Sequence, residues 1–524
     1  MKPEEDAHQS IVDELVHQFT DPFAFYRELI QNSIDAGSTR IEVTLSFRPG
    51  ATDGLLLACV ADWGEGMNRR IIEDYLVTKF RSTKENDFTK IGKFGIGFVS
   101  VFACQPDAVT VDTGRDGESW RVLFRKDTTW ELLQPKEPVE GTRVTVHKQL
   151  SAHAYQEFVE HSRASVQRWC RHSEAEVVFS AGAADGSAPP PHAPVREPLA
   201  VDAPFQVQHL EEGTQIVAGP ARAAQPLTGF YNRGLTLLET TEPLVEGVAL
   251  KIVSRYLEHT LTRDNVRRDK HFGQALALAR RLVDGPLRDQ LPGELRAAAD
   301  RPSGMDDWTT LFHYAVGRLP ATALWYRQTG GGAVSHAELQ RAVNATGALL
   351  VSLEPTPTVE RLRNAGRPVL ELAPFGPLAA AVKTQLRAKQ AALADGWATY
   401  AEPPAGPQPP GFSAALTELL GAAGAKTTQA AVTEVRGAAK QEPMVLVERL
   451  GQPIEADVAR GSPFSRQAPP VLCLNRAHPS IAAAEPLFAT APRLAAVLMA
   501  RLVLVRWSKL DDAADRRLTE WALA

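Results

Sequence analysis

The sequence predicts an α+β protein of several domains, whose N-terminal domain has helices on one face of a mainly antiparallel sheet. Apolar residues recur at helical spacing from about Gln9 to Asp35, whereas Arg40–Phe47 alternates apolar and polar side chains. Further strand-like runs follow one another directly, as in antiparallel sheets. The 524 residues exceed the roughly 250–300 that a single core serves, so three or four domains are expected.

The first helical stretch is interrupted near Thr20-Asp21-Pro22. Asp21 can cap a second helix there, and Pro22 suits its first turn. Gly37 then ends that helix. Besides Arg40–Phe47, strands of this domain are expected at Leu55–Ala61, Trp120–Phe124 and Thr142–His147.

Two segments rich in proline, glycine and alanine, Ser180–Pro198 and Glu402–Gly411, resemble linkers because they can neither continue a helix nor bury much surface. The predicted domains are 1–180, 199–300, 301–401 (an α/β extension of the middle region) and 412–524. The elements expected after the first domain are a strand at Gly247–Val253, helices at Phe272–Leu282 and Leu378–Ala394, strands at Met444–Val447 and Pro470–Leu474, and terminal helices.

Charge and cysteine content narrow the class of protein. Lys plus Arg number 57 and Asp plus Glu 62, a formal charge of −5, so nothing global favours nucleic acid or an anionic membrane as partner. One local basic cluster consists of Arg255, Arg263, Arg267, Arg268 and Lys270. It is either a solvated helix face or a surface that contacts nucleic acid. The four cysteines form no CxxC pair, and the N-terminus lacks a signal-peptide pattern. The longest apolar run near the C-terminus, Leu494–Val505, is too short to span a bilayer, so we expect a cytoplasmic protein.

Three polar residues share one face of the helix that ends at Gly37. Glu28, Asn32 and Asp35 stand at positions i, i+4 and i+7, with apolar residues on the other sides. The amide oxygen of Asn32 can ligate Mg²⁺, and the carboxylate of Glu28 can orient and deprotonate a water molecule. Polar residues at this spacing are usually a solvated face, so the helix alone does not identify a site.

The segment Val60–Met67 places an aspartate at the end of an apolar strand. Asp62 can accept a hydrogen bond from an exocyclic amine, while Gly64 and Gly66 would let the backbone approach a flat ring. A tight turn is the alternative, because Asp and Gly both favour turns.

A glycine-rich stretch, Ile91–Phe102, leads into another apolar helical run. Its glycines can expose backbone N–H groups at a helix N-terminus, where the helix dipole also favours phosphate. It is neither a Walker A loop, since no GKS or GKT follows, nor a GxGxxG motif, since Ser100 takes the third glycine position. Close helix packing through the glycines is the alternative. The charged segment Asp74–Lys90 before it is expected to form a mobile lid.

Four short segments, taken in chain order, resemble the four signature boxes of the GHKL ATPases: ELIQNSIDA, DWGEGM, IGKFGIGF and Gly141-Thr142. This superfamily includes gyrase, heat shock protein 90, histidine kinases and MutL. The likeness is closest to heat shock protein 90 and covers Gln9 to about Phe179. The resemblance implies a Bergerat-type (GHKL) ATP-binding α/β sandwich. An α/β middle domain and a mixed, helix-rich C-terminal region would follow it.

The resemblance also implies residue roles towards ATP and Mg²⁺. Glu28 matches the water-activating base, Asn32 the Mg²⁺ ligand, and Asp62 the aspartate that binds the adenine amine. The other expected nucleotide contacts are Asp35, Gly64, Gly66, Met67, Lys84, Gly92, Lys93, Phe94, Gly95, Ile96, Gly97, Phe98 and Thr142. A base at Glu28 favours hydrolysis over phosphotransfer to a histidine, for which no acceptor helix is recognisable.

A thinner likeness continues to Val266, in a segment similar to the chaperone segment that sends an arginine to the γ-phosphate. Arg263 is the expected match, with Asn265 or Arg267 as substitutes and a basic surface helix as the alternative. The leading hypothesis is an ATP-hydrolysing conformational clamp, a heat shock protein 90-like chaperone with a protein client. There are two alternatives. One is a nucleic-acid clamp of the MutL or MORC type, and the other is a nucleotide-gated signalling or defence component.

The last domain offers two weaker features. Asn475 and His478 follow a strand and form either a site or, more commonly, a turn capped by the asparagine. The apolar helix Leu494–Val505 suits a core or a dimer interface. A homodimer is preferred, because ATP-gated clamps need a partner subunit and homodimers are the commonest assembly.

Overall fold

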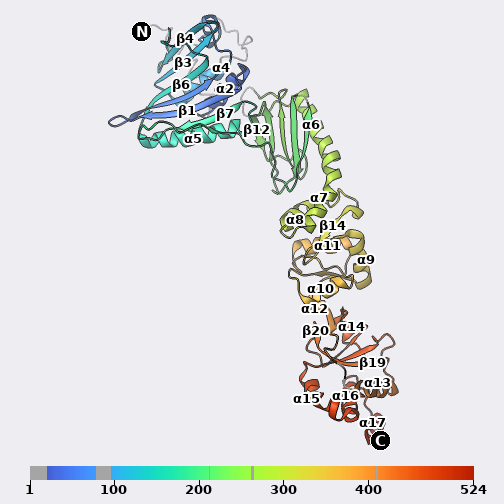
Figure 1. The fold of residues 1–524 in the computed structure, drawn as a ribbon. Helices are drawn as coiled ribbons and strands as arrows, with labels where there is room; N and C mark the ends of the chain where they lie inside the picture. The colour runs from blue at the N-terminus through green and yellow to red at the C-terminus, as the bar shows by residue number, and fades with distance from the viewer. Residues whose placement is uncertain are drawn as a thin grey trace. The chain divides into compact units, whose positions relative to one another are not determined.

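The computed structural model describes residues 21–77, 96–211, 213–260, 265–406, 408 and 411–523, and Figure 1 shows it as a ribbon. The chain forms two compact units, Met1–Leu287 and Arg288–Ala524. The predicted domain limits at 180, 199, 301, 401 and 412 stay predictions. Among the described residues, no helix is both long and apolar enough to cross a membrane.

The first unit contains an eight-stranded sheet in the order β5-β4-β3-β6-β2-β1-β7-β8. Neighbouring strands are antiparallel except β1 and β7, which are parallel. The strands are β1 Arg40–Arg48, β2 Gly54–Asp62, β3 Ala108–Arg115, β4 Glu118–Arg125, β5 Trp130–Leu133, β6 Gly141–Leu150, β7 Glu176–Ala181 and β8 Ala193–Pro194. The four strands predicted for this domain are therefore confirmed.

Helices α2 (Phe25–Asp35) and α5 (Ala152–Cys170) pack on one face of this sheet (Figure 1). Alternate residues of β1, from Ile41 to Phe47, are buried in one core with apolar residues of both helices. The two helices also meet directly, since the hydroxyl of Tyr26 donates to Ser162 Oγ at 2.9 Å. The predicted α+β sandwich with helices on one face is confirmed.

The boundaries of α2 follow local capping rules, with one correction. Gly37 adopts a left-handed φ of 78° just after the helix, as predicted for a helix end. Asp21 accepts a hydrogen bond from the Phe23 N–H at 2.9 Å, but the N-cap position belongs to Ala24, which provides no side-chain cap. Asp21 therefore stabilises the turn that precedes the helix rather than its first turn.

Part of the first glycine- and proline-rich segment is built into the eight-stranded sheet. Its residues Ala193–Pro194 form β8, which pairs with β7, and Ser180 donates to the Pro190 carbonyl. The linker prediction for Ser180–Pro198 is wrong, because proline is tolerated on an edge strand, where no further strand needs its missing N–H.

A second sheet completes the first unit, in the order β12-β11-β13-β10-β9. Its strands are β9 Val207–Glu211, β10 Thr214–Pro220, β11 Thr228–Asn232, β12 Leu235–Thr240 and β13 Val248–Ser254. Helix α6 (Lys270–Leu282) packs on it through Phe272, whose ring lies 5.1 Å from that of Phe230, and the π-helix η5 (Val283–Leu287) follows. The predicted strand at Gly247–Val253 and helix at Phe272–Leu282 are confirmed.

The second unit mixes helices with four small sheets, β14-β15, β16-β17, β20-β18-β22 and β19-β23-β21. Its first part contains α7 Arg288–Asp300, α8 Met305–Ala315, η6 Ala321–Ala323, β14 Trp325–Arg327, β15 Ala333–Ser335, α9 His336–Thr346, β16 Ala348–Val351, α10 Pro357–Asn364, α11 Pro377–Leu386, β17 Gln390–Leu393, α12 Ala394–Trp397 and β18 Ala398–Ala401. Its last part contains α13 Phe412–Ala422, β19 Gln429–Thr433, β20 Val435–Gly437, β21 Met444–Val447, β22 Ile454–Glu455, α14 Ala456–Ala459, β23 Val471–Asn475, α15 Pro479–Thr490, α16 Pro492–Arg506 and α17 Asp512–Leu523.

One predicted helix of this unit is only half correct. The expected helix Leu378–Ala394 ends at Leu386, because Arg387 takes a left-handed φ of 52°. The residues after it form β17, which pairs in parallel with β16. Pairing with β16, a strand some forty residues earlier in the chain, thus overrides the helical propensity of the alanine-rich residues in β17.

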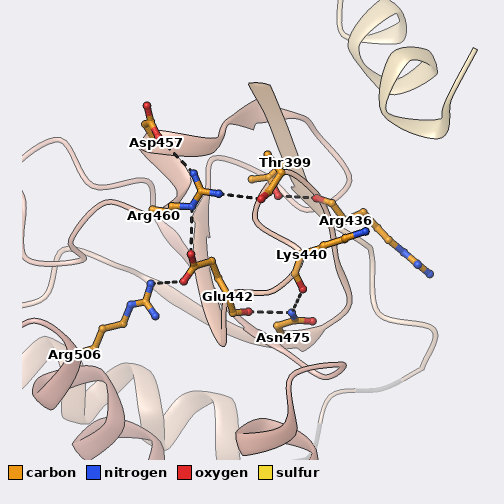
Figure 2. A network of polar contacts seen from close by, with 9 residues as sticks. Thr399, Arg436, Lys440, Glu442, Asp457, Arg460, Asn475 and Arg506 are labelled. Atoms are coloured by element: carbon orange, nitrogen blue, oxygen red, sulfur yellow. Dashed lines mark hydrogen bonds and ion pairs between the residues drawn. The ribbon is translucent and has the colours of Figure 1, made fainter. Parts of the chain in front are cut away.

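The predicted pair of strands in the last part is confirmed, since β21 and β23 are antiparallel with Val445 opposite Cys473. Asn475 ends β23 and is fully buried in a polar network (Figure 2). Its Nδ2 donates to the carbonyls of Lys440 and Glu442 at 2.8 and 2.9 Å. Its Oδ1 accepts from the backbone N–H groups of Val435 and Ala477.

His478 is the N-cap of α15, where its Nδ1 accepts from the Ser480 N–H at 3.3 Å. The structural alternative therefore holds for both residues: Asn475 secures the end of a strand, and His478 begins a helix.

Candidate nucleotide-binding site

A cavity of about 470 Å³ opens between α2, the end of β2 and the segment that follows it. Its volume lies in the range of small-molecule sites. Apolar side chains make most of its walls: Leu29, Ala36, Val60, Met67, Ile71, Leu76, Phe98, Val111 and Val144. The remaining lining residues are Asn32, Ser33, Asp35, Asp62, Glu65, Gly66, Tyr75, Arg115 and Thr142.

Asp62 is the buried carboxylate of this cavity, at the end of β2. Its Oδ2 accepts from Ser33 Oγ at 2.8 Å, and its Oδ1 accepts from the N–H groups of Gly64 and Thr142 at 2.9 and 3.3 Å. Burial raises the pKa of this carboxyl above its ordinary value, and the three donors oppose that rise. A carboxylate has about four acceptor positions, so these bonds leave capacity for a donor inside the cavity.

Thr142 reaches the cavity through strand pairing. It lies opposite Asp62 in the β2–β6 ladder and opposite Thr113 in the β3–β6 ladder. The hydroxyls of Thr113 and Thr142 are 3.0 Å apart, and Thr113 Oγ1 also accepts from the Met67 N–H at 2.9 Å. Sequence reasoning missed Thr113, because nothing near it in the chain marks it; only the sheet register brings it here.

The glycines after Asp62 permit close backbone contacts within the protein. Gly66 has φ 62°, and a Cβ there would lie 2.1 Å from the Gly114 carbonyl oxygen. A Cβ on Gly64 would meet Ala36 at 2.7 Å, and Gly64 does not line the cavity. These glycines therefore let the segment after β2 lie against the sheet and α2. Their observed role is the one expected of a tight turn, which was the alternative to contact with a flat ring.

Helix α2 brings two of its three predicted polar residues to the cavity. Asn32 and Asp35 line it, whereas Glu28 is buried one turn earlier and is not among the lining residues. The predicted common face of the helix is confirmed for Asn32 and Asp35. Ser33, which sequence reasoning did not select, is the helix residue that bonds directly to Asp62.

The predicted phosphate turn is described only from its end. Helix α4 (Ile96–Val99) contains Phe98, which lines the cavity, and Gly97, whose carbonyl accepts from Ser100 Oγ. The side chain of Ile96 and the predicted contacts Lys84, Gly92, Lys93, Phe94 and Gly95 lie outside the described residues. Arg263 and most of the predicted lid Asp74–Lys90 also lie outside them. The part of that lid that is described belongs to the π-helix η1 (Ile72–Leu76), which follows α3 (Arg69–Ile71) and lends Tyr75 and Leu76 to the cavity.

The rim of the cavity carries ion pairs that the sequence did not indicate. Arg115, at the end of β3, lies 3.0 Å from the Glu65 carboxylate. Arg233, in the turn between β11 and β12, lies 3.5 Å from Asp35. Both pairs join residues far apart in the chain, so only the tertiary structure reveals them.

The arrangement suits a flat, partly apolar ligand with a hydrogen-bond donor on its edge. Apolar side chains form the walls, the Asp62 carboxylate receives the donor, and the Thr142 hydroxyl lies beside it. Asn32 contributes an amide group on the side of α2, where a cation bound to ligand oxygens would find an oxygen ligand. The residues present therefore fit a purine nucleotide with a divalent cation.

The N-terminal part of this chain is similar in sequence to known ATPases and chaperones. Residues 24–149 match the family described as histidine kinase-, DNA gyrase B- and HSP90-like ATPase. The chaperone protein HtpG of Chlorobium luteolum is 31% identical over 173 residues, covering 26% of this chain and 26% of the relative. HtpG of Chlorobium phaeovibrioides is 29% identical over 191 residues, covering 30% of this chain and 29% of the relative.

The matched segments span less than a third of those chaperones, and the family match ends within β6. It includes α2, β2, the cavity residue Phe98 and the strand that carries Thr142. The N-terminal part of this chain, residues 24–149, is therefore an ATPase domain of the GHKL family, related to that of heat shock protein 90.

Proposed function

We propose that this chain binds and hydrolyses Mg-ATP in the cavity beside Asp62 and uses the cycle to change its conformation. The observation that carries the proposal is the buried Asp62 carboxylate, oriented by three donors at the base of a largely apolar cavity. Such a carboxylate would accept the exocyclic amine of adenine, while the apolar walls would hold the ring.

In this proposal the base of the nucleotide contacts Asp62, Thr142 and Met67. Thr142 donates its backbone N–H to Asp62 and keeps its hydroxyl near that carboxylate through Thr113. Since Met67 is tied by its own N–H to Thr113, the three base contacts share one hydrogen-bonded frame. A frame that is in place before binding lowers the entropy lost when the nucleotide binds.

The phosphates would lie towards Asn32 and the glycine-rich turn, with Gly97 at its end. Asn32 would supply an oxygen ligand to Mg²⁺, which neutralises phosphate charge when bound. Glu28, one helical turn before Asn32, would accept a proton from the attacking water. Arg263 would sense the γ-phosphate and couple hydrolysis to the second sheet.

The proposed output is that of a heat shock protein 90-like clamp acting on a protein client, as a cytoplasmic homodimer. The likeness to two HtpG chaperones supports a chaperone role, and four free cysteines suit a reducing compartment. A nucleic-acid clamp gains less support, because Arg267 and Arg268 of the basic cluster already pair with Glu258 and Glu242. A nucleotide-gated switch, with binding rather than turnover as its output, would use the same cavity.

The decisive experiment compares Mg-ATP turnover and ATP binding in the wild type and in Glu28→Ala. We expect the variant to lose turnover by about 10²–10⁴-fold, as on loss of a general base, with ATP affinity kept. Glu160→Ala removes an exposed carboxylate of α5 and serves as the matched control. Equal turnover in Glu28→Ala and the wild type would refute Glu28 as the base. Tight binding by a wild type that does not turn over would favour the nucleotide-gated switch.

A further inference from the structure

A second cavity, of about 280 Å³, lies in the first unit between the end of α5 and the five-stranded sheet. Two cationic side chains line it: Arg171, the C-cap of α5, and Lys251 on β13. Its other lining residues are mostly small or apolar, from two loops and β13: Ala200, Val201, Asp202, Ala221, Ala223, Gln225, Pro226, Leu227 and Ala249. The cavity shares no lining residue with the nucleotide cavity.

Lys251 is buried to an extent that is rare for lysine, with 9% of its surface exposed. Its Nζ lies 3.0 Å from Nε2 of the buried His172, whose Nδ1 lies 3.2 Å from the Glu197 carbonyl. The imidazole can donate from Nδ1 to that carbonyl and accept from the ammonium at Nε2, so a neutral histidine fits both contacts. Burial and the neighbouring Lys251 lower the pKa of His172, in agreement with a neutral ring.

The ammonium of Lys251 has three donors, but His172 is its only hydrogen-bond partner among the described residues. Burial, and after it the charge of Arg171, lowers the pKa of Lys251. Arg171 is also incompletely bonded, since its Nε is buried without a partner in the described part of the chain. Both cations that line the cavity therefore have donors that the described part of the protein does not use.

The carboxylates nearby do not balance these charges. Glu239 pairs with Arg171 and accepts from the Tyr231 hydroxyl at 2.6 Å. The Glu197 carboxylate accepts from Gln167 at 2.7 Å. Asp202 pairs with Arg222, and 77% of its side chain is exposed. The half-buried Glu239 thus pairs with Arg171 rather than with the buried Lys251, although buried charges are ordinarily paired.

We propose that this cavity binds a small oxyanion, of the phosphate or carboxylate class, between Lys251 and Arg171. The anion would accept the free donors of the ammonium and of the guanidinium, whose bonds to oxyanions are among the strong ones in proteins. Because Lys251 belongs to the second sheet and Arg171 to the end of α5, the bound anion joins the sheet to the helix. Oxyanion concentration would then set how firmly the second sheet is held against the ATPase domain.

The probe is inorganic phosphate, titrated calorimetrically into the full nucleotide-free chain at constant ionic strength maintained with chloride. We expect saturable binding that weakens by about tenfold or more in Lys251→Met, because a buried charged hydrogen-bond partner is removed. Lys136→Met, the same change at an exposed lysine outside the cavity, should bind phosphate as the wild type does. Parallel titrations with sulfate and acetate then distinguish a tetrahedral oxyanion from a carboxylate as the preferred ligand.

The nucleotide cavity is the competing site, and Asn32→Asp tests it, because the new carboxylate would repel an anion where the phosphates of ATP are proposed to lie. Phosphate binding retained in Asn32→Asp and lost in Lys251→Met supports the proposal; the reverse pattern overturns it, as does the absence of binding by all three anions. If Lys251→Met does not fold, amide hydrogen exchange of the wild type, measured with and without phosphate, shows which cavity binds the anion. Phosphate should then slow exchange in β13 and at the end of α5, and slowing confined to α2 and β2, or no slowing, overturns the proposal.

Discussion

The Asp62 site in the first unit and the Asn475 network in the second are both buried, polar and placed at the end of a strand. Asn475 uses both amide donors on backbone carbonyls (Figure 2). Both lone pairs of its oxygen accept from backbone N–H groups. Asp62 accepts three donors from the protein and still faces a cavity. Burial of a polar group therefore does not distinguish a ligand site from a structural one; bonding capacity left towards a cavity does.

The largest expected effect is that of Asn475→Asp. The change turns two donors into acceptors that face the carbonyls of Lys440 and Glu442, and it buries a charge. We expect β21 and β23 to lose about 3–5 kcal/mol of protection, the range for an uncompensated buried charge, as measured by hydrogen exchange. Asn344→Asp on the exposed side of α9 should stay within about 0.5 kcal/mol. Equal effects of the two changes would refute the structural role of Asn475.

The converse change, Asp62→Asn, should affect binding instead of folding. Its amide can donate to Ser33 Oγ while that hydroxyl donates to the Leu29 carbonyl at 3.0 Å, so the local bonds survive. We expect ATP affinity to fall by about 100-fold, since a charged acceptor is lost, with the unfolding midpoint kept or raised. Calorimetric titration measures the affinity, with the exposed Asp53→Asn as control. Unaltered affinity would remove the adenine assignment.

Removing an ion pair from each region should change the free energy of unfolding by smaller amounts, and by more in the second unit than at the cavity rim. Arg506 lies 2.7 Å from Glu442, which Arg460 also contacts, and 27% of the Arg506 side chain is exposed. Arg506→Met should cost the second unit about 0.5–1 kcal/mol in urea unfolding. Arg115→Met, which removes the rim pair with the more exposed Glu65, should cost no more than about 0.5 kcal/mol and change ATP affinity by less than about tenfold. A larger loss of unfolding free energy in Arg115→Met than in Arg506→Met would contradict the expected order of the two ion pairs.

The smallest expected effect is a pH dependence of opposite sign in the two regions. Hydrogen bonding to Arg506 lowers the pKa of Glu442, so its contribution is present above its ordinary value of 4.5 and is lost as pH falls through the lowered pKa. Burial raises the pKa of Asp62, so its ionised form costs stability that returns as pH falls through the raised pKa towards 3.8.

Unfolding of the wild type, Glu442→Gln and Asp62→Asn between about pH 7 and pH 3 measures both contributions. Each variant should converge with the wild type once its carboxyl is protonated in both the folded and the unfolded protein, which is below the lowered pKa for Glu442 and below 3.8 for Asp62. We expect Glu442→Gln to converge from the less stable side and Asp62→Asn from the more stable side. Convergence of both variants from one side would contradict the assigned causes.

Much of the ATPase domain could be predicted from its sequence, because its elements follow local rules. Alternation of apolar residues identified β1, and a continuous apolar run identified β2. The end of α2 followed from Gly37, and the order of the boxes indicated a nucleotide site. By contrast, β17 and β8 depend on partners elsewhere in the chain, and an alanine-rich or proline-rich stretch does not reveal them.

The sequence by itself indicated four residues that line the cavity, Asn32, Asp62, Phe98 and Thr142, since each belongs to a short box that is recognisable locally. Only the tertiary structure decided which groups complete the site, because strand register brings Thr113 to Thr142 and Arg115 lines the cavity from the end of β3. It also decided that Asn475 is structural and that Lys251 is a buried cation beside Arg171. The physical reason is common to these cases: periodicity reports which face of an element is apolar, whereas bonding capacity depends on what packing brings to each atom.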